Sequence, residues 1–277
     1  MGVSLDRFAE LLTRDQFALA EACFLIAQDA YPELDVGAGL AELERIADVV
    51  RRRLAADAFP EQKVITLNHC LFEELGFSGN VEEYYDPRNS YLNEVLARRT
   101  GIPITLSVVY LEVGRRLGLR LQGVSFPGHF LVKLRARGGQ LVLDPFTGGE
   151  PQSEADLRER LNQVLPAPIA PDADLDRWLE PASPRQIVAR VLRNLKAIYV
   201  STNRLERALA VINRMLLVTP ESAVELRDRG LTYAQLDCFR PALADLKNYL
   251  RRRPDAPDAM EIQEKVIALK VAVSRLN

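Results

Sequence analysis

The C-terminal third of this chain repeats itself at a fixed distance. Six pairs of similar residues, each separated by 34 positions, are Tyr199 and Tyr233, Leu205 and Phe239, Ala208 and Ala242, Leu209 and Leu243, Leu216 and Leu250, and Pro220 and Pro254. A repeat of this length permits few folds, because one unit cannot bury its own hydrophobic face and must stack on the next. The pattern therefore predicts a stacked helical array.

A period of 34 residues that holds two helices and ends with a proline is the signature of tetratricopeptide repeats. Small residues recur at Ala208 and Ala242, where they let the paired helices approach closely. Residues 258–274 have apolar side chains at helical spacing and predict a helix that caps the array. Residues 184–277 are thus predicted to form an all-α repeat domain whose groove binds a protein or peptide partner.

The part of the chain before the repeats is predicted to be a separate α+β domain over residues 1–165. Helical spacing of apolar residues occurs at 4–30, which holds two helices, and at 40–54, 60–75, 91–96 and 103–117, whereas 77–88 is expected to be a loop. Alternating patterns at 119–124, 130–134 and 140–143 predict three short strands, the last two joined by a turn at Gly138 and Gly139. Prolines at 166, 168, 171 and 181 mark residues 166–183 as a linker.

Composition narrows the possible partners and the compartment. The chain has 36 basic and 38 acidic residues, a net charge of −2, so we expect no nucleic-acid partner and no attraction to a membrane surface. No pattern of a secretion signal occurs, and no apolar run approaches the ~20 residues of a membrane span. Three cysteines, Cys23, Cys70 and Cys238, lack the spacing of a metal site or a disulfide framework. We therefore expect a cytoplasmic protein without metal or cofactor.

Two residues could carry acid–base chemistry. His129 is one of two histidines and follows a Pro-Gly corner at the start of a predicted strand, while Asp144 ends the next strand. A carboxylate in that place could hold one ring nitrogen and orient the other. The structural alternatives are a half-buried strand histidine and a carboxylate that caps a turn before Pro145.

Four motifs together resemble the bacterial SirB family. They are residues 68–77 (NHCLFEELGF), 86–92 (DPRNSYL), 101–106 (GIPITL) and 123–130 (GVSFPGHF). Members of this family join a transglutaminase-like core domain to C-terminal tetratricopeptide repeats, and a similar domain occurs in a eukaryotic F-box protein. The resemblance covers nearly the whole chain. It implies a papain-like α+β fold for the first domain, with a small antiparallel sheet, but it implies no particular activity.

The resemblance also implies where a nucleophile would be. The transglutaminase superfamily places a cysteine at the N-terminus of a core helix, where the helix dipole lowers the thiol pKa. Counting back from Gly118 puts that position at Pro103 or Ile104, and neither can attack a substrate. Thr105 and Ser107 are nearby hydroxyls, although a hydroxyl needs a better placed base than a thiol does.

Another cysteine could replace the missing one. Cys70 follows His69 on a predicted helix, but adjacent helical residues point in different directions and do not form a dyad. Cys70 could still face His129 from another element. Cys23 is expected in the hydrophobic core, and Cys238 occupies a repeat position.

Polar residues before the core helix have two interpretations. Asn89 or Ser90 could cap the short helix that follows, and Asn93 could satisfy a buried backbone group. Alternatively, these side chains line a cleft that would suit a peptide or a small polar ligand. The other residues of that cleft would be Tyr84, Tyr85 and Arg88.

These observations leave three hypotheses for function. The first is a catalytically inactive transglutaminase-like protein that binds or regulates a partner together with its repeats. The second is a peptidase, amidase or acyltransferase that uses His129 and Asp144 with a non-standard nucleophile. The third is a structural platform for the repeats. The missing cysteine and the repeat period favour the first.

Overall fold

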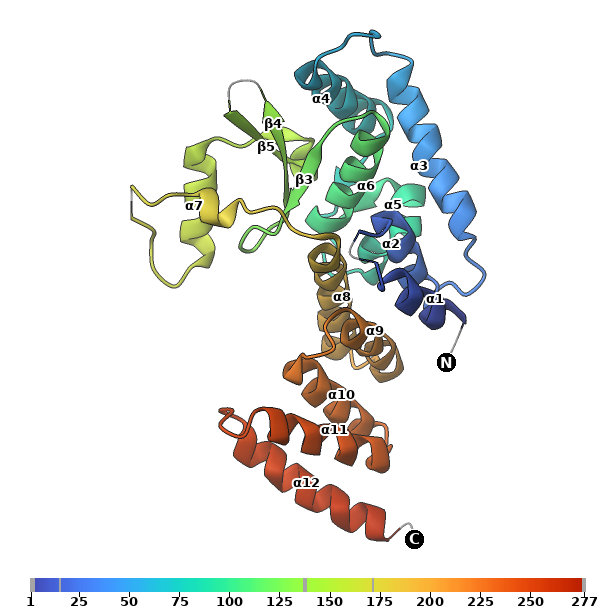
Figure 1. Cartoon of the computed structure of the whole chain (residues 1–277), viewed down its shortest axis with the longest axis vertical. Coiled ribbons are helices and arrows are strands. Elements are labelled where there is room, and N and C mark those ends of the chain that lie inside the picture. Colours follow the sequence, from blue (N-terminus) through green and yellow to red (C-terminus); the bar gives the residue numbers. More distant parts are fainter. Residues whose placement is uncertain (1–2, 15, 137–138, 171, 276–277) are drawn as a thin grey trace. The chain divides into compact units, whose positions relative to one another are not determined.

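The computed structural model describes residues 3–14, 16–136, 139–170 and 172–275. The chain is mainly helical with small sheets, so the predicted α+β class is confirmed (Figure 1). It divides into two compact units, which are described one by one. The sheet unit is Thr13–Val191, and the repeat unit combines Met1–Leu12 with Leu192–Asn277. The boundaries predicted from the sequence, 1–165, 166–183 and 184–277, stay a prediction about independently folding domains.

The sheet unit is built around one buried helix. Its α-helices are α2 (Leu19–Ala27), α3 (Val36–Arg51), α4 (Pro60–Asn68), α5 (Leu92–Arg98), α6 (Pro103–Arg116) and α7 (Glu154–Val164). Every residue of α6 from Pro103 to Gly114 is buried, and the helix packs against α2, α3, α5 and the sheet. Glu112 is the only charged residue of α6 between Pro103 and Gly114, so this part of the helix has no charged face and packs in the interior.

Four strands form an antiparallel sheet with the order β3-β4-β5-β6. They are β3 (Leu121–Val124), β4 (Leu131–Ala136), β5 (Gly139–Asp144) and β6 (Glu150–Pro151), and a separate parallel pair joins β1 (Ser78–Gly79) to β2 (Thr100–Gly101). The three-strand prediction therefore missed β6, β1 and β2, because strands of two residues are too short to show alternation. Gly138 of the predicted turn and Pro171 of the predicted linker lie outside the described residues.

The helix predicted at 60–75 changes type part-way along. α4 ends at Asn68, and the π-helix η1 (His69–Glu74) follows. At its end the Leu75 N–H donates to the Cys70 carbonyl, five residues earlier, as in a π-helix. Gly76, with φ +70°, then ends the segment as its glycine predicted. Short π-helical segments are frequent at functional sites, and this one lies directly after Asn68.

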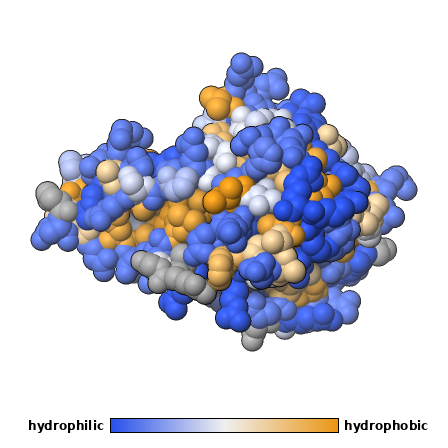
Figure 2. Space-filling view, turned by 90° about the horizontal axis from the view of Figure 1, so that it is seen from above, coloured by the Kyte–Doolittle hydropathy of each residue, from blue (hydrophilic) through white to orange (hydrophobic). Residues whose placement is uncertain are grey.

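One side of the sheet is covered by a hydrophobic cluster. Its buried members are Val124, Phe126, Leu131, Val142, Leu157, Leu161, Leu175 and Leu179, and Trp178 of η4 (Asp176–Trp178) packs against them. Leu157 and Leu161 come from α7, which begins with a capping box between Ser153 and Asp156. Seen from above, hydrophobic residues gather towards the middle of the face among hydrophilic ones (Figure 2). The segment after β6 thus supplies packing as well as a connection.

The repeat unit contains α9 (Leu205–Val218), α10 (Ala223–Gln235) and α11 (Phe239–Arg252), which the 34-residue period predicted, and α12 (Ala259–Ser274), which its own apolar spacing predicted. It also contains the C-terminal part of α8 (Pro184–Ser201) and α1 (Val3–Leu11), although the sequence pattern placed α1 in the first domain. Ala208 and Ala242 are fully buried, as close helix packing requires. α1 packs on α9, where the Arg214 guanidinium lies 4.8 Å from the Phe8 ring centroid and donates to the Ser4 hydroxyl at 2.9 Å.

Ion pairs connect alternate helices of the repeat unit. Lys196 of α8 bonds to Glu225 at 2.9 Å and to Asp228 at 2.8 Å, both on α10. Arg227 then reaches from α10 to Asp258, just before α12, at 2.8 Å. Because these side chains are partly or largely buried, the cost of removing their charges from water offsets much of the attraction within each pair.

We expect Ala242→Leu to lower the free energy of unfolding by about 1–3 kcal/mol, because extra methylenes in a packed core force neighbouring side chains apart. Urea unfolding followed by circular dichroism checks this. Ala268→Leu is the matched control, since Ala268 is exposed on α12 and the same substitution there should change stability by less than about 0.5 kcal/mol. Equal losses in both variants would contradict close packing at Ala242.

Candidate functional site

The structure places His129 and Asp144 in direct contact. His129 Nε2 lies 2.9 Å from both carboxylate oxygens of Asp144. Gly128, with φ +69°, turns the chain before His129, and the His129 N–H donates to the Phe126 carbonyl at 3.1 Å. Asp144 is fully buried, and the His129 side chain is 13% exposed. A strand start and a strand end thus supply the two halves of a histidine–carboxylate dyad.

Asp144 has partners besides the imidazole. Arg160 of α7 donates to Oδ2 at 2.8 Å, and the Phe146 N–H donates to Oδ1 at 3.0 Å. The second bond caps the short helix η3 (Pro145–Thr147), so the turn-capping role and the dyad role coexist in one carboxylate. Sequence reasoning missed Arg160, because nothing in the sequence marks an arginine on a later helix as its partner.

The dyad leaves the second ring nitrogen of His129 available. Because carboxylate oxygens only accept hydrogen bonds, Nε2 carries the proton in the neutral ring and Nδ1 holds a lone pair. Within the part of the chain that the structure describes, no group is hydrogen-bonded to Nδ1. The imidazole can therefore accept a hydrogen bond or a proton from a ligand.

The helix that should hold the nucleophile begins without one. α6 starts at Pro103 after its N-cap Ile102. The Thr105 hydroxyl accepts from the Ile102 N–H at 3.1 Å and donates to the Asn89 carbonyl at 2.7 Å, so it serves the helix cap. Ser107 is fully buried, and its Oγ has no hydrogen-bond partner among the described residues. Neither hydroxyl is exposed to a substrate.

The cysteines do not replace the missing thiol. Cys70 is fully buried in η1, and burial raises the pKa of its thiol. Burial also raises the pKa of Cys23 to about 12, with a smaller contribution from nearby Glu112. Since the thiolate is the reactive form, a raised pKa disfavours reaction of both thiols at neutral pH. Cys238 is exposed but belongs to the repeat unit.

Asn89 organises the loop that carries the tyrosines. It is fully buried, and its amide donates to the Glu83 carbonyl at 2.7 Å while its oxygen accepts from Asn80 at 3.2 Å. Within the polar stretch, Ser90 is also buried at the end of η2 (Pro87–Ser90), and the Asn93 side-chain oxygen is buried without a hydrogen-bond partner among the described residues. These geometries place Asn89 and Ser90 inside the loop.

A row of aromatic rings leads from the dyad to the surface. The His129 ring centroid lies 5.9 Å from that of Phe146, which lies 6.3 Å from that of Tyr84, both in edge-to-face geometry. Tyr84 in turn contacts Tyr85, which is 78% exposed. Phe146 fits because Gly79 has no side chain, since a Cβ there would lie 2.5 Å from the ring. Sequence reasoning missed Phe146, although its place directly after Asp144-Pro145 was a signal.

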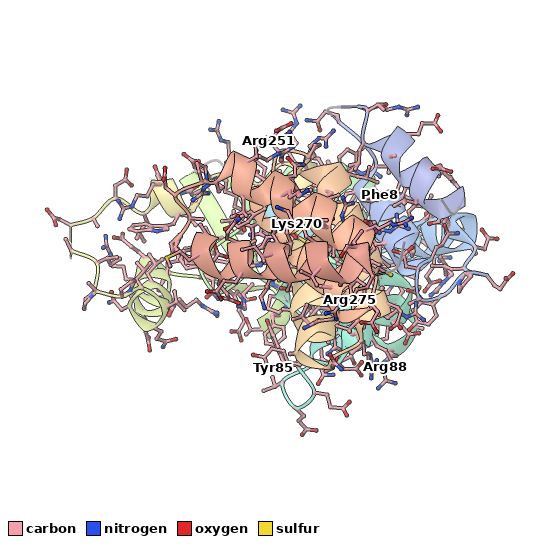
Figure 3. All side chains as sticks on the ribbon, turned by 90° about the horizontal axis from the view of Figure 1, so that it is seen from below. Phe8, Tyr85, Arg88, Arg251, Lys270 and Arg275 are labelled. Atoms are coloured by element: carbon pink, nitrogen blue, oxygen red, sulfur yellow. The ribbon has the colours of Figure 1, made fainter. Side chains whose placement is uncertain are left out.

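Arg88 shares the loop with the tyrosines. It pairs with Asp86 at 2.6 Å and is half exposed. Figure 3 labels Tyr85 and Arg88 towards the lower side of the view, and Arg88 lies in η2, which follows the tyrosines. These two side chains are therefore accessible to a ligand, unlike the buried Asn89.

A hydrogen-bond chain ties the core helix to the dyad. The Tyr110 hydroxyl on α6 donates to Asn68 Oδ1 at 2.7 Å, and the Asn68 amide donates to the Gly149 carbonyl at 2.9 Å. The Gly149 N–H then donates to the Asp144 carbonyl at 2.8 Å. Gly149 has φ +77°, and a Cβ there would collide with the Asn68 side chain. Asn68, the first residue of the motif at residues 68–77, thus positions the loop that follows Asp144.

Comparisons with known proteins agree with this architecture. A family model of the transglutaminase-like superfamily matches residues 38–193, and a tetratricopeptide-repeat model matches residues 195–266. The chain belongs to the transglutaminase-like superfamily. No solved structure shows a significant match to it.

Bacterial relatives of this transglutaminase-like chain match it along most of its length. A UPF0162 protein of Xylella fastidiosa strain Temecula1 is 43% identical over 91% of this chain and 89% of its own length. The UPF0162 protein YchA of Escherichia coli K12 is 31% identical over 88% of each chain. Protein SirB1 of Salmonella typhimurium is 28% identical over 81% of this chain and 82% of its own. The predicted resemblance to the SirB family is confirmed.

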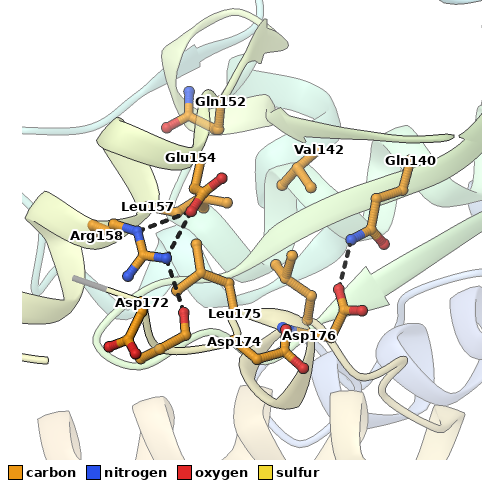
Figure 4. A pocket seen from close by; sticks show the side chains of 12 residues that line it. Gln140, Val142, Gln152, Glu154, Leu157, Arg158, Asp172, Asp174, Leu175 and Asp176 are labelled. Carbon is orange, nitrogen blue, oxygen red and sulfur yellow. Dashed lines mark hydrogen bonds and ion pairs between the residues drawn. The ribbon is translucent and has the colours of Figure 1, made fainter. Parts of the chain in front are cut away.

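A polar cavity lies apart from the dyad of this transglutaminase-like unit. It has a volume of about 390 Å³ between β5, α7 and residues 172–179. Arg158 crosses one side, donating to Glu154 at 2.6 Å and to the Ala173 carbonyl at 2.8 Å, and Gln140 bonds to Asp176 at 3.0 Å (Figure 4). Its polar groups therefore mostly satisfy one another.

Among all the residues that the structure describes, no group of His, Cys, Asp and Glu could hold a metal ion. No helix among them is long and apolar enough to cross a membrane.

We expect one fast-reacting thiol in the folded protein. Cys238 is exposed and should react with Ellman's reagent at once, whereas Cys23 and Cys70 should react only after unfolding, because burial raises both thiol pKa values. Thiol counting with and without urea measures this. In Cys238→Ser the fast phase should vanish, and a fast phase that remains there would show that one of the other thiols is accessible.

Proposed function

We propose that this chain is a pseudoenzyme, a transglutaminase-like protein that binds its partners and does not transfer amide groups. The observation that supports the proposal is the start of α6 at Pro103, because the resemblance puts the superfamily's cysteine at Pro103 or Ile104 and neither residue is a nucleophile. Three other candidate nucleophiles of the sheet unit, Thr105, Ser107 and Cys70, are all buried. A nucleophile must reach the substrate, so burial removes each of them.

The dyad is suited to ligand binding. His129 Nδ1 can accept a hydrogen bond, and Asp144 and Arg160 hold the ring in one orientation. Phe146 and Tyr84 add an aromatic wall beside it. A few fixed polar groups next to apolar and aromatic surface are typical of binding sites for peptides and small molecules. The ligand class that fits is a peptide segment that offers an N–H or hydroxyl donor.

The repeat unit supports the same proposal. Tetratricopeptide repeats build extended concave surfaces that bind protein segments, and the family comparison finds such repeats at residues 195–266. We infer that the repeat unit takes a protein partner and that the protein works in the cytoplasm. The three cysteines, which are all free thiols, support a reducing compartment.

One observation favours a second candidate, an acyl-transfer or hydrolytic enzyme with a serine nucleophile. The Ser107 hydroxyl has no hydrogen-bond partner among the described residues, and the dyad has the geometry of a base with its orienting carboxylate. A fluorophosphonate probe separates the two candidates. Labelling of the chain that disappears in both Ser107→Ala and His129→Ala would replace the binding proposal with the enzyme.

We expect Pro103→Cys to create an activated thiol. The substitution is combined with Cys238→Ser, which removes the exposed native thiol, so that the reaction of the new cysteine can be followed alone. If the dyad and the α6 N-terminus keep the superfamily geometry, the new thiol should have a pKa below the ordinary value of about 8.5. The rate of alkylation by iodoacetamide as a function of pH measures this pKa.

The matched control adds His129→Ala to the same background. Its thiol should react more slowly at neutral pH, because no imidazole is left to stabilise the thiolate. Equal pH profiles with and without His129 would show that the dyad does not face the start of α6, and the proposal that only the thiol is missing would then be wrong.

A further inference from the structure

An apolar groove lies on the sheet unit beside the dyad. It has a volume of about 600 Å³ between α4, η1, β5 and the glycine turn before β6. We infer that this groove binds a peptide segment in which apolar side chains alternate with lysine or arginine. The inference rests on the proposed binding function and names the class of ligand that the sheet unit takes.

The floor and walls of the groove are hydrophobic. Val64 and Leu143 are buried beneath it, and Leu141 is partly exposed in it. Ile65 of α4 is 68% exposed, and Pro151 on β6 is exposed. Large aliphatic side chains that are exposed to water next to a concave apolar surface mark a surface on which a ligand can bind. An aliphatic side chain of the ligand would fill the groove and remove Ile65 from water.

The rim of the groove is acidic. Glu61, Glu73 and Glu150 line it, and among the described lining residues the only other side chain that can carry charge is His69. His69 is itself held by acids, with Nδ1 2.8 Å from Glu73 and Nε2 3.2 Å from Glu74. Carboxylates around an apolar floor complement a ligand that has cationic side chains on both sides of an apolar one. An acidic or neutral peptide would lack those pairs.

The groove ends at the groups that support the dyad. Asn68 and Gly149 both line it, and the same two residues are joined by the 2.9 Å hydrogen bond from the Asn68 amide. Gly149 also donates to the Asp144 carbonyl. A ligand in the groove would therefore contact the chain that fixes Asp144, and its binding should reach the environment of His129.

The two histidines of the chain provide the first measurement. One lies in the groove and the other in the dyad, so proton NMR of the ring C–H groups reports on both, with His69→Gln for assignment. The probe is a Lys-Leu-Lys-Leu-Lys peptide with blocked ends, and Glu-Leu-Glu-Leu-Glu is its control. We expect the basic peptide to shift the His69 signals in a saturable way and the acidic one to leave them unchanged. No shift with the basic peptide, or equal shifts with both, would overturn the inference.

Charge variants provide the second measurement. Glu73→Lys together with Glu150→Lys should weaken the binding of the fluorescein-labelled basic peptide at least about tenfold, because each replaces an attraction by a repulsion. The matched control is Glu82→Lys with Glu83→Lys, which makes the same change in net charge on exposed or partly exposed positions that do not line the groove, and it should change affinity less than about twofold. Equal losses in both double variants would show only general charge attraction.

These results are separable from the test of the missing thiol. If Pro103→Cys shows no dependence on His129 while the groove still binds the basic peptide, the dyad geometry fails and the groove stands. If the thiol behaves as expected and the groove binds no peptide, the groove inference fails and the pseudoenzyme proposal stands.

Discussion

The sheet unit depends on the buried carboxylate of Asp144. A carboxylate without water is costly unless other groups replace its hydration. Here the replacements come from separate elements: His129 before β4, Arg160 on α7 and the Phe146 N–H in η3. These three contacts connect the ends of the strands, the turn and α7 through one carboxylate. Removing one partner of such a group costs about 3–5 kcal/mol in other proteins.

The contacts of Asp144 do not require a nucleophile next to His129. Asp144 is needed to cap η3 and to pair with Arg160, whatever His129 does. Its main chain is held in addition through Gly149 and Asn68 to Tyr110 on the core helix. A histidine held against a carboxylate is therefore compatible with a structural or binding role, and its geometry alone is no evidence of catalysis. The evidence that separates the roles lies at the start of α6.

The sequence predicted those parts of the site that are set by local pattern. His129 and Asp144 flank two neighbouring strands joined by a short turn, so the antiparallel register had to bring them close. The repeat period predicted α9 to α11, because the apolar positions of one repeat recur 34 residues later in the next. The helical spacing of apolar residues at 258–274 predicted α12. Arg160, Tyr110 and Asn68 could not be predicted in the same way. Each is a polar residue on a helix whose partner is chosen by the packing of distant elements, and the π-helix after Asn68 depends on backbone bonds that no side-chain pattern encodes.

Pro103 affects both the stability and the chemistry of the start of α6. A thiol at that position would have its pKa lowered by the helix dipole and would form part of the binding surface. Proline instead fixes φ, and its missing N–H is one that the first turn leaves unbonded in any case. The helix start is thereby stabilised without a nucleophilic side chain at Pro103, and Thr105 completes the cap by donating to the Asn89 carbonyl. Because the Asn89 amide also donates to the Tyr84 carbonyl, the cap of α6 and the loop of Tyr84 share one residue. The start of α6 and the loop of Tyr84 are thereby held by one buried side chain, which is the fixed surface that the proposed binding function requires.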